Sequence, residues 1–240
     1  MKRNLFIAPI VLVGLFCMSQ MVRADDSSIV AISIDPAENA DITAPFAYVA
    51  PAIPNGSLIA HISFNENDGT VAHDSSGNGN DALVSEDTVW VPGMNGGAIS
   101  FNGTNDRALI PNDIIGIGSV TACVSYNANS LPSGAVLISN SQFAISINQN
   151  GAVAVTNDGS RFVASSNSII PGTWNTVCVG RDASGQTTLN INGALNAQGD
   201  AGIPVAGSSV GIGGHPWYDG HGWDGLISDV RIYSGIVDAR

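Results

Sequence analysis

The stretch QFAISINQNGAVAVTNDGSRFVAS (residues 142–165) contains three short runs of alternating apolar and polar residues, separated by two turn signals. Alternation with a period of two, rich in β-branched residues, is typical of half-buried strands. Asn150-Gly151 and Asp158-Gly159 are pairs that accept the positive φ angles of tight hairpin turns. The stretch therefore predicts a three-stranded antiparallel meander.

The same pattern extends along the chain on both sides of this meander. The other predicted strands lie at residues 58–64, 97–101, 107–110, 119–126, 135–139, 173–181, 187–192, 208–213 and 226–233. No segment has a convincing helical period. About twelve strands without helices predict an all-β fold, a two-sheet antiparallel β-sandwich of the jelly-roll type.

Two segments precede the predicted sandwich, which spans residues 57–240. Residues 1–24 combine a basic start, an apolar run at 5–16 and small residues before a cut after Ala24, as in a secretory signal peptide. The apolar run is too short to span a bilayer. Residues 25–56 are rich in Ala and Pro and predict a leader or linker, with one edge strand at 28–34. We expect a secreted protein, extracellular or periplasmic.

The charge of the chain excludes some partners. The full sequence has a formal net charge of −12, and removal of residues 1–24 leaves five Arg and no Lys against twenty acids, a net charge of −15. Such a surface repels phosphate backbones and anionic lipid headgroups, so we expect neither nucleic acid binding nor membrane insertion. The acidity suits a cation such as calcium, or serves solubility alone.

Four further stretches occur in a fixed order. They are SLIAHISFNENDGTVAHDSSGNGNDALV (57–84), VPGMNGGAISFNGTNDRALIPN (91–112), TWNTVCVGRDASGQTTLNINGAL (173–195) and GLISDVRIYSGIV (225–237). This set resembles the LamG-like domains of the concanavalin A-like lectin/glucanase superfamily and covers almost all of the predicted domain. The resemblance implies the concanavalin A-like sandwich fold.

Cys123 and Cys178 are the two cysteines left after the signal segment. In an exported protein an even pair predicts a disulfide, and two buried free thiols are the alternative. The stretches TACVSY and TVCVGR resemble two pentraxin strands, and this resemblance implies an inter-strand disulfide at these positions.

The loop at residues 65–81 concentrates groups that suit calcium, which takes about six to eight oxygen ligands. Its candidate ligands are Asp74, Asn80 and Glu66. The family resemblance implies Asp229, in the closing strand, as a further ligand of a structural ion. The alternative is that Asp74 accepts hydrogen bonds from its own loop, as in an Asx-turn.

The segment HPWYDGHGWDG (215–225) holds half of the four Trp residues and is predicted to be a loop at the rim of the sandwich. Aromatic faces stack on sugar rings, and acidic and imidazole groups bond to hydroxyls. The candidate ligand-binding residues are Trp217, Tyr218, Asp219, His221, Trp223 and Asp224. Two alternatives stay open: Trp223 packs into the end of the core, or Asp219 or Asp224 binds calcium.

Catalysis is not expected. Glycosidases need two carboxylates flanking the bond, and hydrolases of the superfamily resemble one another in an E-x-D-x-E strand that this chain lacks. The leading hypothesis is a secreted, non-catalytic, lectin-like module that binds a glycan or cell-surface polysaccharide and is stabilised by calcium. The alternative is an extracellular adhesion or structural protein that binds another protein through its LamG-like domain.

Overall fold

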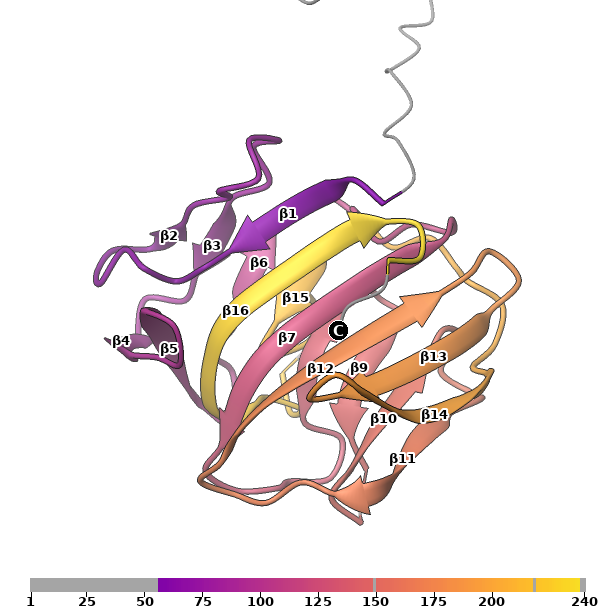
Figure 1. Ribbon diagram of the computed structural model, residues 1–240. Coiled ribbons are helices and arrows are strands. Elements are labelled where there is room, and N and C mark those ends of the chain that lie inside the picture. Colours follow the sequence, from indigo (N-terminus) through magenta and orange to yellow (C-terminus); the bar gives the residue numbers. More distant parts are fainter. Residues whose placement is uncertain (1–55, 149, 218, 238–240) are drawn as a thin grey trace, which may run out of the picture. The chain divides into compact units, whose positions relative to one another are not determined.

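The computed structural model describes residues 56–148, 150–217 and 219–237. These residues form sixteen strands in two antiparallel sheets (Figure 1). No membrane-spanning helix occurs among them. The predicted two-sheet β-sandwich is confirmed, whereas the predicted signal peptide and edge strand at 28–34 lie outside the described residues.

The first sheet, sheet A, carries the long central strands. Its order is β14-β13-β12-β7-β16-β5-β4, and β1 pairs with β16. The first part of β16 pairs with β5 and the later part with β1, while β7 runs along its other side (Figure 1). The strands are β1 (Leu58–Ile62), β4 (Val89–Pro92), β5 (Gly97–Asn102), β7 (Val120–Ala128), β12 (Trp174–Arg181), β13 (Gln186–Ile191), β14 (Ala194–Asp200) and β16 (Asp224–Ser234).

The second sheet, sheet B, has the order β11-β10-β9-β8-β15-β6-β3-β2. Strand β10 pairs antiparallel with both β9 and β11, so the predicted meander is present. The strands are β2 (Val71–Ala72), β3 (Ala82–Val84), β6 (Ala108–Ile110), β8 (Val136–Ser139), β9 (Ala144–Ile147), β10 (Ala152–Thr156), β11 (Val163–Ser168) and β15 (Val210–Ile212).

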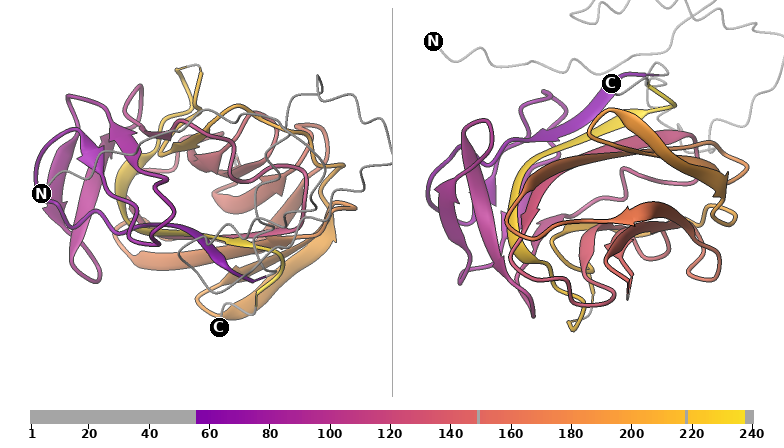
Figure 2. Two further views of the ribbon diagram at one scale, coloured as in Figure 1. Left: turned by 90° about the horizontal axis from the view of Figure 1, so that it is seen from above. Right: turned by 60° about the horizontal axis from the view of Figure 1, so that its bottom comes forward.

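The core lies between the two sheets, which Figure 2 shows as two facing layers. Alternate residues of each strand face inward, because side chains of a strand point to opposite faces of the sheet. Val124, Val177 and Val230 of sheet A are fully buried, as are Ile145 and Val153 of sheet B. Their neighbours along the sheet A strands face outward, and this second set forms the floor of the site.

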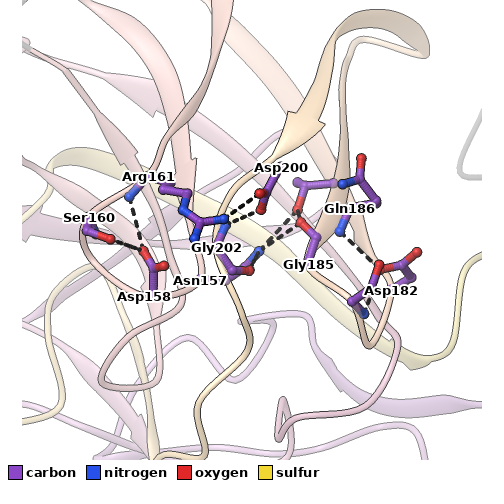
Figure 3. A network of polar contacts seen from close by, with 11 residues as sticks. Asn157, Asp158, Ser160, Arg161, Asp182, Gly185, Gln186, Asp200 and Gly202 are labelled. Carbon is purple, nitrogen blue, oxygen red and sulfur yellow. Dashed lines mark hydrogen bonds and ion pairs between the residues drawn. The ribbon is translucent and has the colours of Figure 1, made fainter.

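A polar network joins the two sheets where β11 and β14 lie at neighbouring edges (Figure 3). The buried Asn157 amide donates to the carbonyl oxygens of Gly185 at 3.4 Å and Gly202 at 3.2 Å. Beside it Arg161 forms an ion pair with Asp200. These contacts fasten the loop after β10 to the open end of the β13–β14 hairpin, opposite the turn at Asn192.

Candidate functional site

A groove with a volume of about 860 Å³ lies on the outward face of sheet A. It runs over β16, β7, β12 and β13, the strands at the front of Figure 1. Its lining side chains alternate in sequence with the buried core residues of the same strands. They include Cys123, Ser125, Trp174, Thr176, Cys178, Asn190, Asn192, Asp229, Arg231 and Tyr233.

Strand register arranges these side chains in rows across the sheet. Asp229 lies opposite Ser125, and Ser125 lies opposite Thr176. The hydroxyls of Ser125 and Thr176 are hydrogen-bonded at 2.8 Å. In the next row Arg231, Cys123, Cys178 and Asn190 follow one another on adjacent strands. Paired antiparallel strands therefore bring residues of distant sequence segments onto one surface.

Two half-buried aromatic residues mark the ends of the groove along the strands. Trp174 pairs with Asn127 and Tyr233 pairs with Thr121, positions six residues apart on β7. At the rise of a β-strand this separation is about 20 Å. Trp and Tyr rings combine a flat apolar face with a polar edge. An extended ligand along the groove would meet an aromatic side chain at each end.

Amide groups line the side of the groove formed by β13. Asn192, in the turn after β13, accepts a hydrogen bond from the Thr176 backbone amide at 2.9 Å and donates to the Asn175 side-chain oxygen at 2.9 Å. Asn192 has a positive φ of 51° and is followed by Gly193 at 80°, as a tight Asn-Gly turn requires. Because Asn and Gln amides both donate and accept, this wall suits a hydroxylated ligand.

Asp229 and Arg231 line the opposite side, and His61 lies next to Asp229. Asp229 Oδ2 accepts a hydrogen bond from Arg231 at 2.9 Å, and Asp229 Oδ1 lies 3.3 Å from His61 Nε2. The His61 contact has ion-pair distance but not hydrogen-bond geometry, and Oδ1 makes no hydrogen bond within the described residues. Oδ1 is a buried atom, and the Asp229 side chain as a whole is 17% exposed.

The predicted Cys123–Cys178 disulfide is confirmed, and it lies in the floor of the groove. The two residues are directly opposite each other on β7 and β12. The exposed fractions of the two residues are 9% and 7%, so the bridge is almost buried, and its small exposed part contributes to the groove surface. It locks the two central strands in register beneath the aromatic and amide side chains.

The C-terminal segment bounds the groove. Thr121 donates its hydroxyl hydrogen to the Gly235 carbonyl and accepts a hydrogen bond from the Val237 amide at 3.0 Å. Val237 lines the groove, whereas the adjacent Ile236 lines a second hollow of about 400 Å³ over Gly180. The segment thus separates the two hollows on this face.

Asp74, the first predicted calcium ligand, uses its carboxylate to hold its own loop together. Oδ1 accepts hydrogen bonds from the amides of His61 and Ser76, both at 2.9 Å. Oδ2 accepts from the Asn80 amide at 2.9 Å and the Ser76 hydroxyl at 2.8 Å. Burial raises the pKa of Asp74, but these hydrogen bonds outweigh it and the pKa is lowered. These contacts match the alternative to metal binding, in which Asp74 accepts hydrogen bonds from its own loop as in an Asx-turn.

The other predicted metal ligands do not converge on Asp74. The Asn80 side-chain amide donates to the Ile59 carbonyl at 2.9 Å, and Glu66 accepts from the His73 amide at 2.8 Å. Asp229 faces His61 and Arg231 in the groove. No group of three or more His, Cys, Asp or Glu side chains that would suit a metal occurs among the described residues. The four predicted residues therefore do not form one ligand set, because most face backbone donors or cations.

We predict that Asp74→Asn makes the free energy of unfolding depend less on pH between neutrality and acid. A carboxyl whose folded pKa is lowered stabilises the fold above its unfolded pKa of about 4 and loses this contribution as the pH falls through the folded value. Urea unfolding of the wild type and the variant between neutral pH and about pH 3 measures this. The free-energy difference between the two should be largest near neutrality and shrink with falling pH, and a constant difference would contradict the assignment.

The predicted rim loop packs against the turn between β5 and β6. A Cβ on Gly222 would lie 2.6 Å from the Thr104 amide nitrogen, so only glycine permits this approach. Asp219 forms an ion pair with Arg107 at 2.9 Å, and Trp217 is 46% exposed. His221 is also exposed. These three candidates remain on the surface, whereas Tyr218 lies outside the described residues.

Two of the rim candidates have structural roles, since Trp223 lies in the core and Asp224 holds a neighbouring loop. Trp223 has no exposed surface and meets Tyr126 edge to face, with ring centroids 5.4 Å apart. It cannot act as the predicted stacking platform, because the strand β16 begins directly after it and turns it into the core. Asp224 accepts hydrogen bonds from Asn129 at 3.2 Å and from the Ser130 hydroxyl. Its role here is to tie β16 to the loop after β7.

The groove residues Trp174, Tyr233, Asn190 and Arg231 were not among the sequence-based candidates. Their signal was present: in each predicted strand, the polar or aromatic positions alternate with the apolar ones and so share one face. What the sequence does not contain is the order of the strands. Without it, side chains that meet across β16, β7, β12 and β13 are not recognisable as one surface.

Comparison with known proteins agrees with this architecture. Residues 102–239 match the family model described as the concanavalin A-like lectin/glucanases superfamily. No curated protein matches the sequence.

Several solved structures are similar. Domain 4 of AbnA, a GH43 extracellular arabinanase from Geobacillus stearothermophilus in complex with arabinotriose, matches with TM-score 0.61 and 21% identity, over 75% of this chain and 94% of that one. Trypanosoma rangeli sialidase in complex with sialic acid has TM-score 0.61 and 18% identity, over 80% of this chain and 34% of that one. The botulinum neurotoxin serotype D binding domain has TM-score 0.55 and 16% identity, over 75% and 49%. At these identities the likeness concerns the fold.

Proposed function

We propose that this chain, which belongs to the concanavalin A-like lectin/glucanase superfamily, is a secreted, non-catalytic carbohydrate-binding module. The observation that carries the proposal is the outward groove of sheet A, lined by Trp174, Tyr233 and Asn190 around the disulfide. The proposal moves the principal site from the rim loop to the sheet face.

The chemistry of the groove supports a sugar ligand. The C–H faces of a pyranose or furanose are apolar and stack on aromatic rings such as Trp174. Sugar hydroxyls donate and accept hydrogen bonds, which matches the side chains of Asn190, Asn192 and Asp229. A volume of about 860 Å³ is that of an open small-molecule site.

Two further observations support a binding role. The AbnA domain, similar over 94% of its length, is in complex with arabinotriose. Asp229 is the only carboxylate among the described residues that line the groove. Glycosidases usually employ two carboxyl groups about 5–10 Å apart, so the lining favours binding without bond cleavage.

A glycan array tests the proposal directly. The protein without residues 1–24 is applied to immobilised glycans, once with calcium and once with a chelator, after circular dichroism has established that it is folded. Selective binding is the expected result, and its loss with chelator would support the calcium expectation. A folded protein that binds no glycan would contradict the proposal and direct the search to protein partners.

We predict that Trp174→Ala weakens binding to the best array glycan by about tenfold, taking as a guide the stacking of a nucleic acid base on an aromatic side chain, which contributes about 1–3 kcal/mol. Titration calorimetry measures the affinity. Trp217→Ala, an equally drastic change at the exposed rim, is the matched control and should bind as the wild type does. The reverse pattern would place the site on the rim loop.

A further inference from the structure

The groove contains one acidic and one basic side chain whose charges cancel. Asp229 and Arg231 are the only charged side chains among the described residues that line it, and they contact each other at 2.9 Å. His61, from β1, approaches the same carboxylate at 3.3 Å. The described lining therefore carries no net charge, on a chain whose formal net charge is −12.

We propose that the groove selects uncharged glycans and excludes those that carry uronic acid, sialic acid or sulfate groups. This inference rests on the proposed function and specifies its ligand class. Its basis is the juxtaposition of a paired Asp229–Arg231 with neutral amides, hydroxyls and aromatic rings along the rest of the groove.

Among the described lining residues an acidic sugar would find no uncompensated cation. The Arg231 guanidinium, the one in that lining, is already hydrogen-bonded to Asp229. An anionic group that approached Arg231 would also approach the Asp229 carboxylate, which His61 and Arg231 hold in place. Like charges at such short range repel, and the acidic surface adds to the effect.

A neutral glycan makes use of the same pair. Asp229 Oδ1 is buried next to His61, the Asp229 side chain as a whole is 17% exposed, and its orientation is fixed by two neighbours. A hydrogen bond from a sugar hydroxyl to an ionised carboxylate is stronger than one between neutral groups. The partly exposed Asp229 side chain is thus suited to accept a hydrogen bond from a sugar hydroxyl, while His61 and Arg231 hold its orientation.

The test uses an array that presents neutral glycans beside counterparts bearing a uronic acid, sialic acid or sulfate group. The inference expects every positive spot to be neutral and each acidic counterpart to be weaker. Stronger binding to an acidic counterpart than to its neutral parent would overturn the inference and leave the proposed function standing. Silence on all spots would instead contradict the proposed function, on which the inference rests.

A variant tests the residue assignment. Asp229→Asn removes the carboxylate charge and leaves Arg231 uncompensated, so we expect affinity for the best neutral glycan to fall about tenfold or more and binding to acidic counterparts to rise. Asp219→Asn is the matched control, because it breaks an exposed ion pair with Arg107 on the rim, outside the groove lining. Unchanged neutral binding by a folded Asp229→Asn protein would overturn the assignment.

Discussion

Trp223→Ala is expected to lower the free energy of unfolding by about 3–5 kcal/mol, the usual cost of removing a large aromatic side chain from a core. Trp223 is fully buried, packs edge to face against Tyr126 and closes the end of the sandwich where β16 begins. Truncation leaves a cavity between two well-packed sheets, which relax only in part. Urea unfolding followed by circular dichroism measures the loss.

The neighbouring Trp217 supplies the control for this prediction. It lies in the same loop but is 46% exposed, so Trp217→Ala should cost far less stability. If the two variants lost the same small amount of stability, Trp223 would not be a core residue and the rim loop would again be the leading binding site.

Loss of the disulfide is expected to have the second large effect. The cross-link closes a segment in which the two cysteines are 55 residues apart, and the chain-entropy model assigns it about 4 kcal/mol of stability. We predict that the double variant Cys123→Ala and Cys178→Ala loses about this amount in urea unfolding. Because the bridge lies in the groove floor, its glycan affinity should fall as well.

Reduction of the wild type gives an independent check of the same quantity. The wild type unfolded in the presence of a reductant should have the stability of the double variant, since both lack the cross-link. A double variant as stable as the oxidised wild type would show that pairing of β7 with β12, rather than the covalent bond, sets the register of the groove floor.

The alternation of apolar and polar residues was enough to predict most strands. All twelve strands expected within residues 58–233 are present, with shifted ends. The chain reverses at both Gly-containing positions of the meander, where Gly151 and Gly159 have positive φ, but the connection between β10 and β11 spans residues 157–162 and is not the expected tight turn. Such features can be predicted from neighbouring residues alone, because they do not depend on residues distant in the sequence.

The strands that sequence reasoning missed lack this local signal. Strands β2 and β3 have two and three residues, too few for a period to show. Strand β4 ends in Pro92, and β14, ALNAQGD, is mostly Ala and polar residues with low β-propensity. Their pairing partners, not their own composition, hold them in the sheets.

The site was harder to predict than the fold for the same reason. The aromatic residues of the loop at 215–225 are close together in sequence and so predicted a binding site there, yet Trp223 is buried. The groove instead gathers Trp174 from β12, Asn190 from β13 and Arg231 from β16, and only the strand order brings them together. Likewise nothing in the sequence indicated that Arg181 would be buried, with its guanidinium bonded to loop carbonyls such as that of Gly116 at 3.0 Å.

The most direct test of the account is an NMR titration of the folded domain with the best glycan of the array, following the backbone amide signals. We predict that the largest shift changes fall on the outward groove of sheet A, at residues 123–125, 174–178, 190–193 and 229–233. Changes confined to residues 215–224 would contradict the account and return the binding site to the rim loop.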